Sequence, residues 1–172
     1  MGYYESKVVN AYGRKLIMII EGSSGTHFVF EDFFKGVFAI HPKVAFTEKE
    51  ASLFAIAMGN VANQCKKEGI SKDDIGNANI IISDDGSYSF KLSDEDTGTY
   101  GYFMINIVYP MKYIRERNQD IFTIIVFTEE LAHFVWPKLS EMEIKIKIID
   151  ILKPIIPEMS IKLLKDFGIH TD

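Results

Sequence analysis

Residues 121–136, IFTIIVFTEELAHFVW, predict a buried helix that carries three titratable side chains. A helix that is apolar on every side must be surrounded by other apolar elements, so this one is expected at the centre of the fold. Burying an ionised group is costly unless the group is paired or binds a metal, so Glu129, Glu130 and His133 need partners. At about 100° per residue, the three side chains project into one sector of the helix.

The composition is that of an ordinary globular domain. The chain has 172 residues, of which 47% are hydrophobic and 25% are charged, so we expect one domain over residues 1–172. A formal net charge of -5 does not favour a general nucleic-acid-binding surface. Because Cys65 is the one cysteine, we expect neither disulfides nor a thiolate zinc cluster, and a metal would need histidine and carboxylate ligands.

The N-terminal sequence lacks the basic and then apolar pattern of a secretory signal. The apolar run over residues 16–20 is too short to span a bilayer. We therefore expect a cytoplasmic protein without a membrane partner.

Helices are predicted in the first part of the chain. Residues 5–20 indicate a helix or a helix followed by a strand, and the aromatic-rich residues 27–39 indicate another helix. Residues 48–68 indicate an amphipathic helix that begins at the capping box of Thr47 and Glu50.

A small sheet is predicted next. Residues 79–92 contain two apolar or alternating runs around Asp84-Asp85-Gly86, and Asp-Gly between such runs is a strong hairpin signal. Residues 102–109 predict a third strand that Pro110 terminates. We expect these strands to form a small antiparallel or mixed sheet.

The remaining sequence is helical. The central helix is predicted over residues 119–136, and a capping box of Ser140 and Glu143 begins the next helix. A last helix is predicted over about residues 158–167. This chain order of helices, a small sheet, one buried helix and a helical C-terminus predicts an α+β fold in which the helices pack on one face of the sheet.

Glu129 and His133 lie four residues apart, the spacing that brings two side chains of one helix to a single metal ion. Glu130 lies beside them, where it would act as the general base for a metal-activated water.

The segment TEELAHFVW, residues 128–136, resembles the HExxH helix of the zincin metallopeptidases, with Glu129 in place of the first histidine. The order of hairpin, strand, helix and further helix over about residues 45–155 is also similar to that family. The resemblance implies a zincin-like fold with Glu129 and His133 as metal ligands and Glu130 as catalytic base. It implies hydrolysis of peptide bonds in a peptide or protein substrate, with zinc as cofactor. Because glutamate is a harder ligand than histidine, manganese or iron is the alternative ion.

Gluzincins, a branch of the zincins, take a third ligand from a glutamate on the following helix. Here the candidates are Glu141, Glu143 and Glu158. Glu141 is preferred because it falls on the isoleucine stripe that is expected to face the core, whereas Glu143 closes the capping box.

Two functions stay open. One is a metal-dependent hydrolase, and the other is a catalytically inactive zincin-fold interaction or regulatory module without metal. If the helix carries no site at all, His133 is expected to be a hydrogen-bonded core residue, and Glu129 and Glu130 are expected to lie at a cavity edge or to pair with Lys145 or Arg115. A carboxylate-bridged di-iron site would need a second Glu-x-x-His, which the sequence lacks. Cys65 falls on an apolar helix stripe and is expected in the core. The oligomeric state is open.

Overall fold

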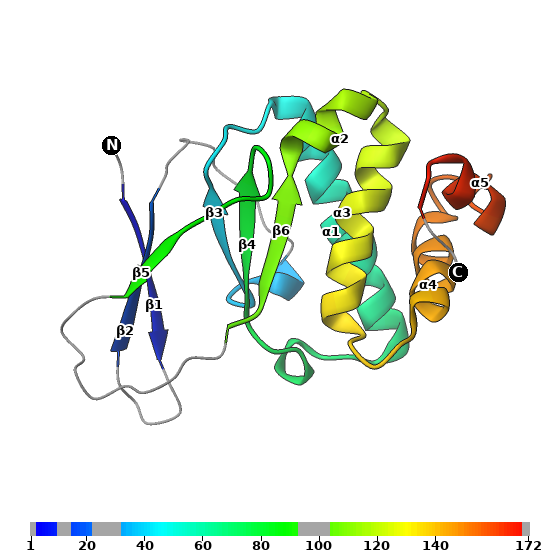
Figure 1. Ribbon diagram of the computed structural model, residues 1–172. Coiled ribbons are helices and arrows are strands. Elements are labelled where there is room, and N and C mark those ends of the chain that lie inside the picture. The colour runs from blue at the N-terminus through cyan, green and yellow to red at the C-terminus, as the bar shows by residue number, and fades with distance from the viewer. Residues whose placement is uncertain (1–2, 10–14, 22–31, 93–103, 170–172) are drawn as a thin grey trace. The chain divides into compact units, whose positions relative to one another are not determined.

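The protein is described from a computed structural model, which describes residues 3–9, 15–21, 32–92 and 104–169. The fold is α+β, as predicted (Figure 1). In chain order the elements are β1 (Tyr3–Val9), β2 (Lys15–Glu21), η1 (Asp32–Phe34), β3 (Phe38–Pro42), α1 (Glu48–Glu68), η2 (Lys72–Asp74), β4 (Ala78–Ser83), β5 (Phe90–Leu92), β6 (Asn106–Pro110), α2 (Met111–Arg117), α3 (Asp120–Val135), α4 (Glu141–Leu152) and α5 (Ile161–Asp166).

The chain divides into two compact units, and each is described by itself. The first holds the strands and the second holds α1, α3, α4 and α5. Their bounds are Met1–His27, Gly36–Phe46 and Asn77–Tyr113 for the first, and Phe28–Lys35, Thr47–Gly76 and Ile114–Asp172 for the second. The single domain expected over residues 1–172 stays a prediction.

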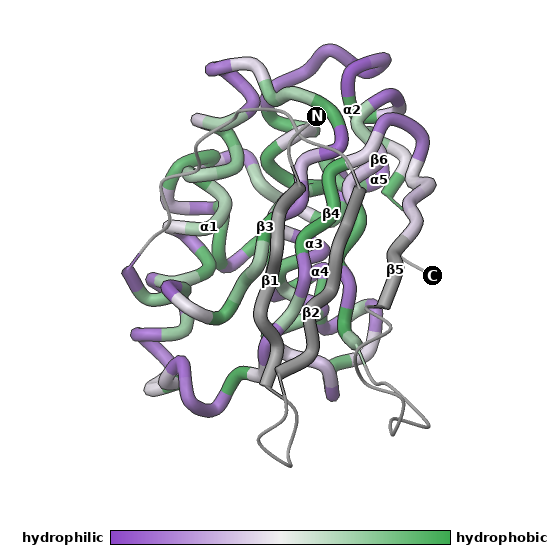
Figure 2. Tube along the Cα trace, turned by 90° about the vertical axis from the view of Figure 1, so that its left-hand side faces the viewer, coloured by the Kyte–Doolittle hydropathy of each residue, from purple (hydrophilic) through white to green (hydrophobic). Residues whose placement is uncertain are grey.

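The first unit contains a parallel sheet in the order β3-β4-β6. In its central register, Ile80 of β4 pairs with Ile40 of β3 and with Ile107 of β6. Every residue of β4 is buried, and its middle is the apolar run Ile80-Ile81-Ile82, where Figure 2 shows the green of hydrophobic residues. A strand buried on both faces reads as a continuous apolar run, which is typical of parallel sheets.

The predicted hairpin over residues 79–92 is wrong, and so is the antiparallel arrangement built on it. β4 pairs in parallel with β3 and β6, while β5 pairs antiparallel with β2 in a second sheet of order β1-β2-β5. Gly86 does turn the chain, with a φ of 89°, but the turn leads away from β4. The third predicted strand begins at Asn106, and residues 102–103 lie outside the described part of the chain.

The predicted helices before residue 42 are also wrong. β1 and β2 pair antiparallel from Tyr3 with Glu21 to Val9 with Lys15, because the isoleucine-rich segment of β2 favours a strand over a helix. Where a helix was predicted over residues 27–39, the described residues form the short 3-10 helix η1 and the start of β3. Residues 27–31 lie outside the described part.

The second unit is built from the predicted helices. α1 begins at the capping box of Thr47 and Glu50 and ends at Gly69, whose φ of 71° closes the helix. α3 forms the predicted central helix and contacts both α1 and α4 (Figure 1). Phe127 of α3 packs edge to face on Phe54 of α1, with ring centroids 5.2 Å apart. The last helix, α5, is shorter than predicted.

Cys65 lies fully buried on α1, as predicted, and burial raises the pKa of its thiol to about 12, with a further contribution from the charge of Glu68. None of the helices in the described segments has both the length and the apolar character needed to cross a membrane.

Candidate metal site

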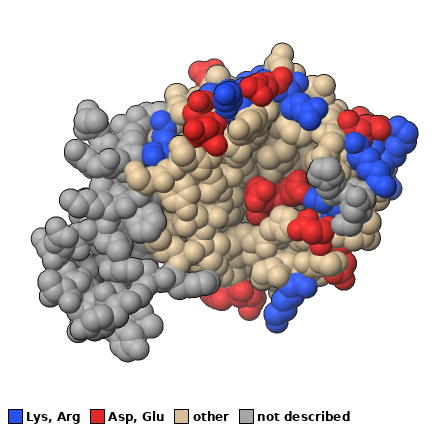
Figure 3. Space-filling view, viewed as in Figure 1, with Lys and Arg blue, Asp and Glu red and all other residues tan. Residues whose placement is uncertain are grey.

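The three residues assigned as metal ligands lie together in the second unit. Glu129 and His133 are on the C-terminal half of α3, and Glu141 is the first residue of α4. One ligand atom of each lies within 4.8 Å of the others, and His133 Nε2 is 3.6 Å from Glu141 Oε1. Figure 3 shows acidic side chains gathered on the face formed by α3 and α4. We call Glu129, His133 and Glu141 the three-residue cluster.

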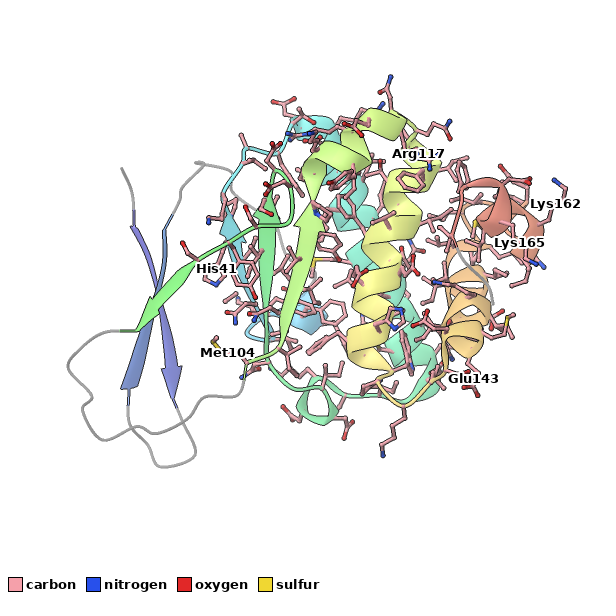
Figure 4. The ribbon with its side chains drawn as sticks, viewed as in Figure 1. His41, Met104, Arg117, Glu143, Lys162 and Lys165 are labelled. Carbon is pink, nitrogen blue, oxygen red and sulfur yellow. The ribbon has the colours of Figure 1, made fainter. Side chains whose placement is uncertain are left out.

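The start of α4 is fixed by a capping box, and this sets the position of Glu141. The Ser140 hydroxyl accepts a hydrogen bond from the Glu143 backbone N–H at 3.4 Å, and the Glu143 carboxylate accepts one from the Ser140 N–H at 2.8 Å. The Ser140 hydroxyl also donates to the Glu143 carboxylate at 2.7 Å, and this hydrogen bond, followed by the one from the Ser140 N–H, lowers the pKa of Glu143. Glu143 therefore serves as a cap at the beginning of α4 (Figure 4), outside the three-residue cluster.

Glu158, the remaining candidate for the third ligand, lies elsewhere in the unit. It follows α4 and lines a cavity together with Asn60 of α1 and Ile155. Of the three glutamates considered, Glu141 is the one that the structure brings next to Glu129 and His133.

Lys145, one turn after Glu141 on α4, adds a positive charge to this group of residues. Its ammonium forms an ion pair with Glu129 Oε1 and lies 3.6 Å from Glu141 Oε2. The residue is 3% exposed, and this burial lowers its pKa. The pairing of Glu129 with Lys145, considered from the sequence as the metal-free arrangement, is confirmed. Arg115 instead holds Glu50 with two hydrogen bonds of 2.7 and 3.0 Å.

Glu130 has the electrostatic character expected of an acid or base. It is partly buried next to Glu129, and burial raises its pKa, an effect that His133 opposes and Glu141 reinforces. A carboxyl group with a raised pKa exchanges protons more readily near neutral pH than an ordinary one. This property fits the role that the resemblance implied for Glu130.

The donor atoms of the three-residue cluster suit a divalent ion. Two carboxylates and one imidazole are ligands that zinc accepts in catalytic sites, and the excess of oxygen donors also suits manganese or iron. Lys145 competes with such an ion, because its ammonium already supplies a positive charge to Glu129. A metal ion at this site must therefore either bind Glu129 together with Lys145 or displace the Lys145 ammonium from it.

A second polar network lies on the parallel sheet of the first unit and was not predicted. His41 Nε2 is 3.2 Å from Asn79 Oδ1, Asn79 donates to Asn106, and Asn106 donates to the Tyr88 hydroxyl. His41, labelled on β3 in Figure 4, is 3% exposed, and burial lowers its pKa although the Asn79 hydrogen bond opposes this. Among the described residues, its Nδ1 atom has no hydrogen-bond partner.

Comparisons with protein-family models, with curated proteins and with solved structures found no match to this chain. The zincin-like fold and site therefore stay a prediction from residues 128–136.

Proposed function

We propose that the protein is a divalent-metal-dependent hydrolase of zincin-like type that acts on peptide bonds. The proposal assigns Glu129, His133 and Glu141 as ligands and Glu130 as general base. The observation that carries it is the convergence of one imidazole and two carboxylates within 4.8 Å, on two helices, next to a carboxyl group whose pKa burial raises.

In the proposed hydrolysis, the base and the third ligand are held by different helices, Glu130 by α3 and Glu141 by α4. A divalent ion, when bound, would polarise the substrate carbonyl and acidify a water molecule. Glu130 takes the proton of the attacking water and passes it to the departing amine, for which its raised pKa suits it. The capping box of Ser140 and Glu143 holds the first turn of α4 in place, and so keeps Glu141 beside His133.

The ion pair of Lys145 with Glu129 supports a second candidate function. In this alternative the protein is an interaction or regulatory module that binds no metal, and the buried ammonium joins α4 to α3 through Glu129. Removing one partner of a buried ion pair is strongly destabilising, so such a pair can persist for structural reasons alone.

Metal content separates the two functions. Protein purified without a histidine tag or chelator is measured by elemental analysis and by calorimetric titration with Zn²⁺, Mn²⁺ and Fe²⁺. The hydrolase proposal expects about one equivalent of one ion and a loss of that ion in His133→Ala. Less than about a tenth of an equivalent, with no uptake on titration, would overturn it.

The assigned base is tested in the metal-loaded protein. Glu130→Gln should leave metal content unchanged and lower the rate of cleavage of a fluorogenic peptide library by about 10²- to 10⁴-fold. The matched control is Glu116→Gln on α2, an exposed residue outside the three-residue cluster, which should leave both quantities unchanged. If Glu130→Gln abolishes metal binding, Glu130 is a ligand and the assignment of roles is wrong.

A further inference from the structure

A cavity of about 580 Å³ lies in the second unit, between α1, α3 and the segment that follows α4. Sites for small molecules range from about 300 to 1,000 Å³, so this volume is sufficient for one. Five isoleucines contribute to the lining, and two of them, Ile56 and Ile155, are 41% and 45% exposed at its rim. Such exposure of large apolar side chains around a hollow is typical of a binding site.

This cavity is separate from the three-residue cluster. Ile124, in the cavity wall, precedes His133 by nine positions on α3. At 1.5 Å per residue, this places them about 14 Å apart along the helix axis. The inference below therefore does not depend on the proposed metal site.

Gly59 gives an independent indication of a ligand. It lies in the interior of α1, where glycine destabilises a helix relative to alanine, and it lines the cavity. Its φ is not in the left-handed region, and a Cβ added there would meet no atom of the described part of the chain within 4 Å. Neither the backbone nor the described neighbours require a glycine. A molecule that packs against the bare helix backbone at this position accounts for it.

The polar groups that line the cavity indicate which charge a bound molecule would carry. Glu158 is the one charged residue in the lining, and Asn60 and Asn63 of α1 add amide groups. The Asn60 side-chain N–H₂ group donates one hydrogen bond to the Ile56 carbonyl of its own helix at 2.8 Å, which leaves its amide oxygen and its second N–H for a ligand. The amide groups therefore do not select a charge, whereas the Glu158 carboxylate at the edge of an apolar cavity favours a cationic donor over an anion.

We propose that this cavity binds an amphipathic organic ammonium ion, with its apolar body on the isoleucines and Gly59 and its ammonium group on Glu158. The probe is n-octylammonium, compared with n-octanol and octanoate, which share its chain length but differ in charge. Binding is followed through the isoleucine methyl NMR signals of the full chain. Octylammonium should shift the signals of Ile121, Ile124 and Ile156, and octanoate should bind at least about tenfold more weakly.

Three variants test the assignment of residues. Gly59→Leu fills the cavity from the helix side and should abolish binding, while Gly59→Ala should weaken it and raise the melting temperature. Glu158→Gln should weaken octylammonium binding about tenfold and leave octanol unchanged. Ile146→Ala, at a half-exposed isoleucine on α4 outside the lining, is the control and should leave binding unchanged.

Equal affinity for octylammonium and octanoate would overturn the proposal, as would binding that persists in Gly59→Leu. Absence of any shift at the lining isoleucines would also overturn it. If a lysine-containing peptide shifts these signals while octylammonium does not, the cavity is a docking site for a protein segment, and the small-molecule proposal is wrong.

Discussion

Replacing Lys145 by methionine is the perturbation that best separates a metal site from a structural ion pair. The side chain of Lys145 is 3% exposed and that of its partner Glu129 is 16% exposed, so both charges are largely removed from water. Methionine retains most of the apolar volume of lysine but removes the ammonium. Without a metal, Lys145→Met leaves the Glu129 carboxylate without its counter-ion.

The expected magnitude follows from this burial. Removing one partner of a buried ion pair lowers the free energy of unfolding by about 3–5 kcal/mol. Because the Glu129 side chain keeps some exposure to water, we expect the lower end of this range, about 3 kcal/mol. For a chain of 172 residues, about 2–4 °C of melting temperature corresponds to each kcal/mol, so we expect a decrease of roughly 6–12 °C. A double variant, Lys145→Met with Glu129→Leu, removes both charges and should recover most of this loss.

The assay is thermal unfolding followed by circular dichroism, in EDTA and then in Zn²⁺ or Mn²⁺. If the three-residue cluster binds the ion, a concentration of about 100 times the Kd adds about 2.7 kcal/mol and restores most of the stability of Lys145→Met. Wild type should gain less at the same concentration, because its ammonium competes for Glu129. Lys162→Met is the control, since the Lys162 side chain is 84% exposed and its ion pair with Asp166 should contribute under about 1 kcal/mol.

Two results would refute this reasoning. A variant that melts within about 2 °C of wild type in EDTA would mean that the ion pair contributes little to stability. A variant that is destabilised but gains nothing from any divalent ion would refute the metal site and leave the structural module as the better function.

Three further predictions concern other parts of the second unit. Burial raises the pKa of Glu50, but hydrogen bonds from Arg115 and Thr47 outweigh this effect, so the pKa lies below its usual value. Glu50→Gln should therefore lower the free energy of unfolding by about 1 kcal/mol, as measured by urea titration at pH 7. Because the folded-state pKa is the lower one, this difference should disappear as the pH falls below the usual carboxyl value of 4.5 and through the folded-state pKa. Cys65, with its pKa raised to about 12 by burial, should react with a thiol reagent at pH 8 only after unfolding. Ser140→Ala should lower the free energy of unfolding by about 1 kcal/mol in denaturant titration, since it removes the cap of α4; an unchanged value would contradict the role of that cap.

The helices of the second unit could be predicted because their signals are local. The hydroxyl of Thr47 and the carboxylate of Glu50 meet within one turn, so four residues of sequence are enough to place the start of α1. The same holds for Ser140 and α4. α3 was recognisable because it is apolar on every side.

The sheets could not be predicted in this way, because strand pairing is not local. Asp85-Gly86 predicts a hairpin wherever two strands flank it, but the partners of β4 are β3, which precedes α1, and β6. The uninterrupted run Ile80-Ile81-Ile82 is the local signal for a strand buried on both faces, but it does not indicate which strands lie beside it.

The candidate site could be predicted only in part from the sequence. Glu129 and His133 are one helical turn apart, so their convergence follows from the sequence alone. The place of Glu141 depended on how α4 lies against α3. The isoleucines at 144, 148 and 151 are buried as the predicted stripe requires, but the Glu141 side chain is 62% exposed, so the expectation that it faces the core is wrong. That Glu129 pairs with Lys145, whereas Arg115 pairs with Glu50, depends on the packing of the helices and not on local sequence, and the burial of His41 beside Asn79 likewise depends on the packing of the sheet.

The position of β4 has a consequence for how the chain reaches its native state. Its two neighbours in the sheet are separated from it by the whole of α1 on one side and by β5 and its flanking segments on the other. Contacts between residues so far apart in sequence form late, because loop closure must precede them, whereas the capped helices form locally and early. During that interval the segment Asn79-Ile80-Ile81-Ile82-Ser83 is an uncovered strand of high β-propensity. Pairing between chains at this segment therefore competes with folding, and the yield of refolding should fall as the protein concentration rises.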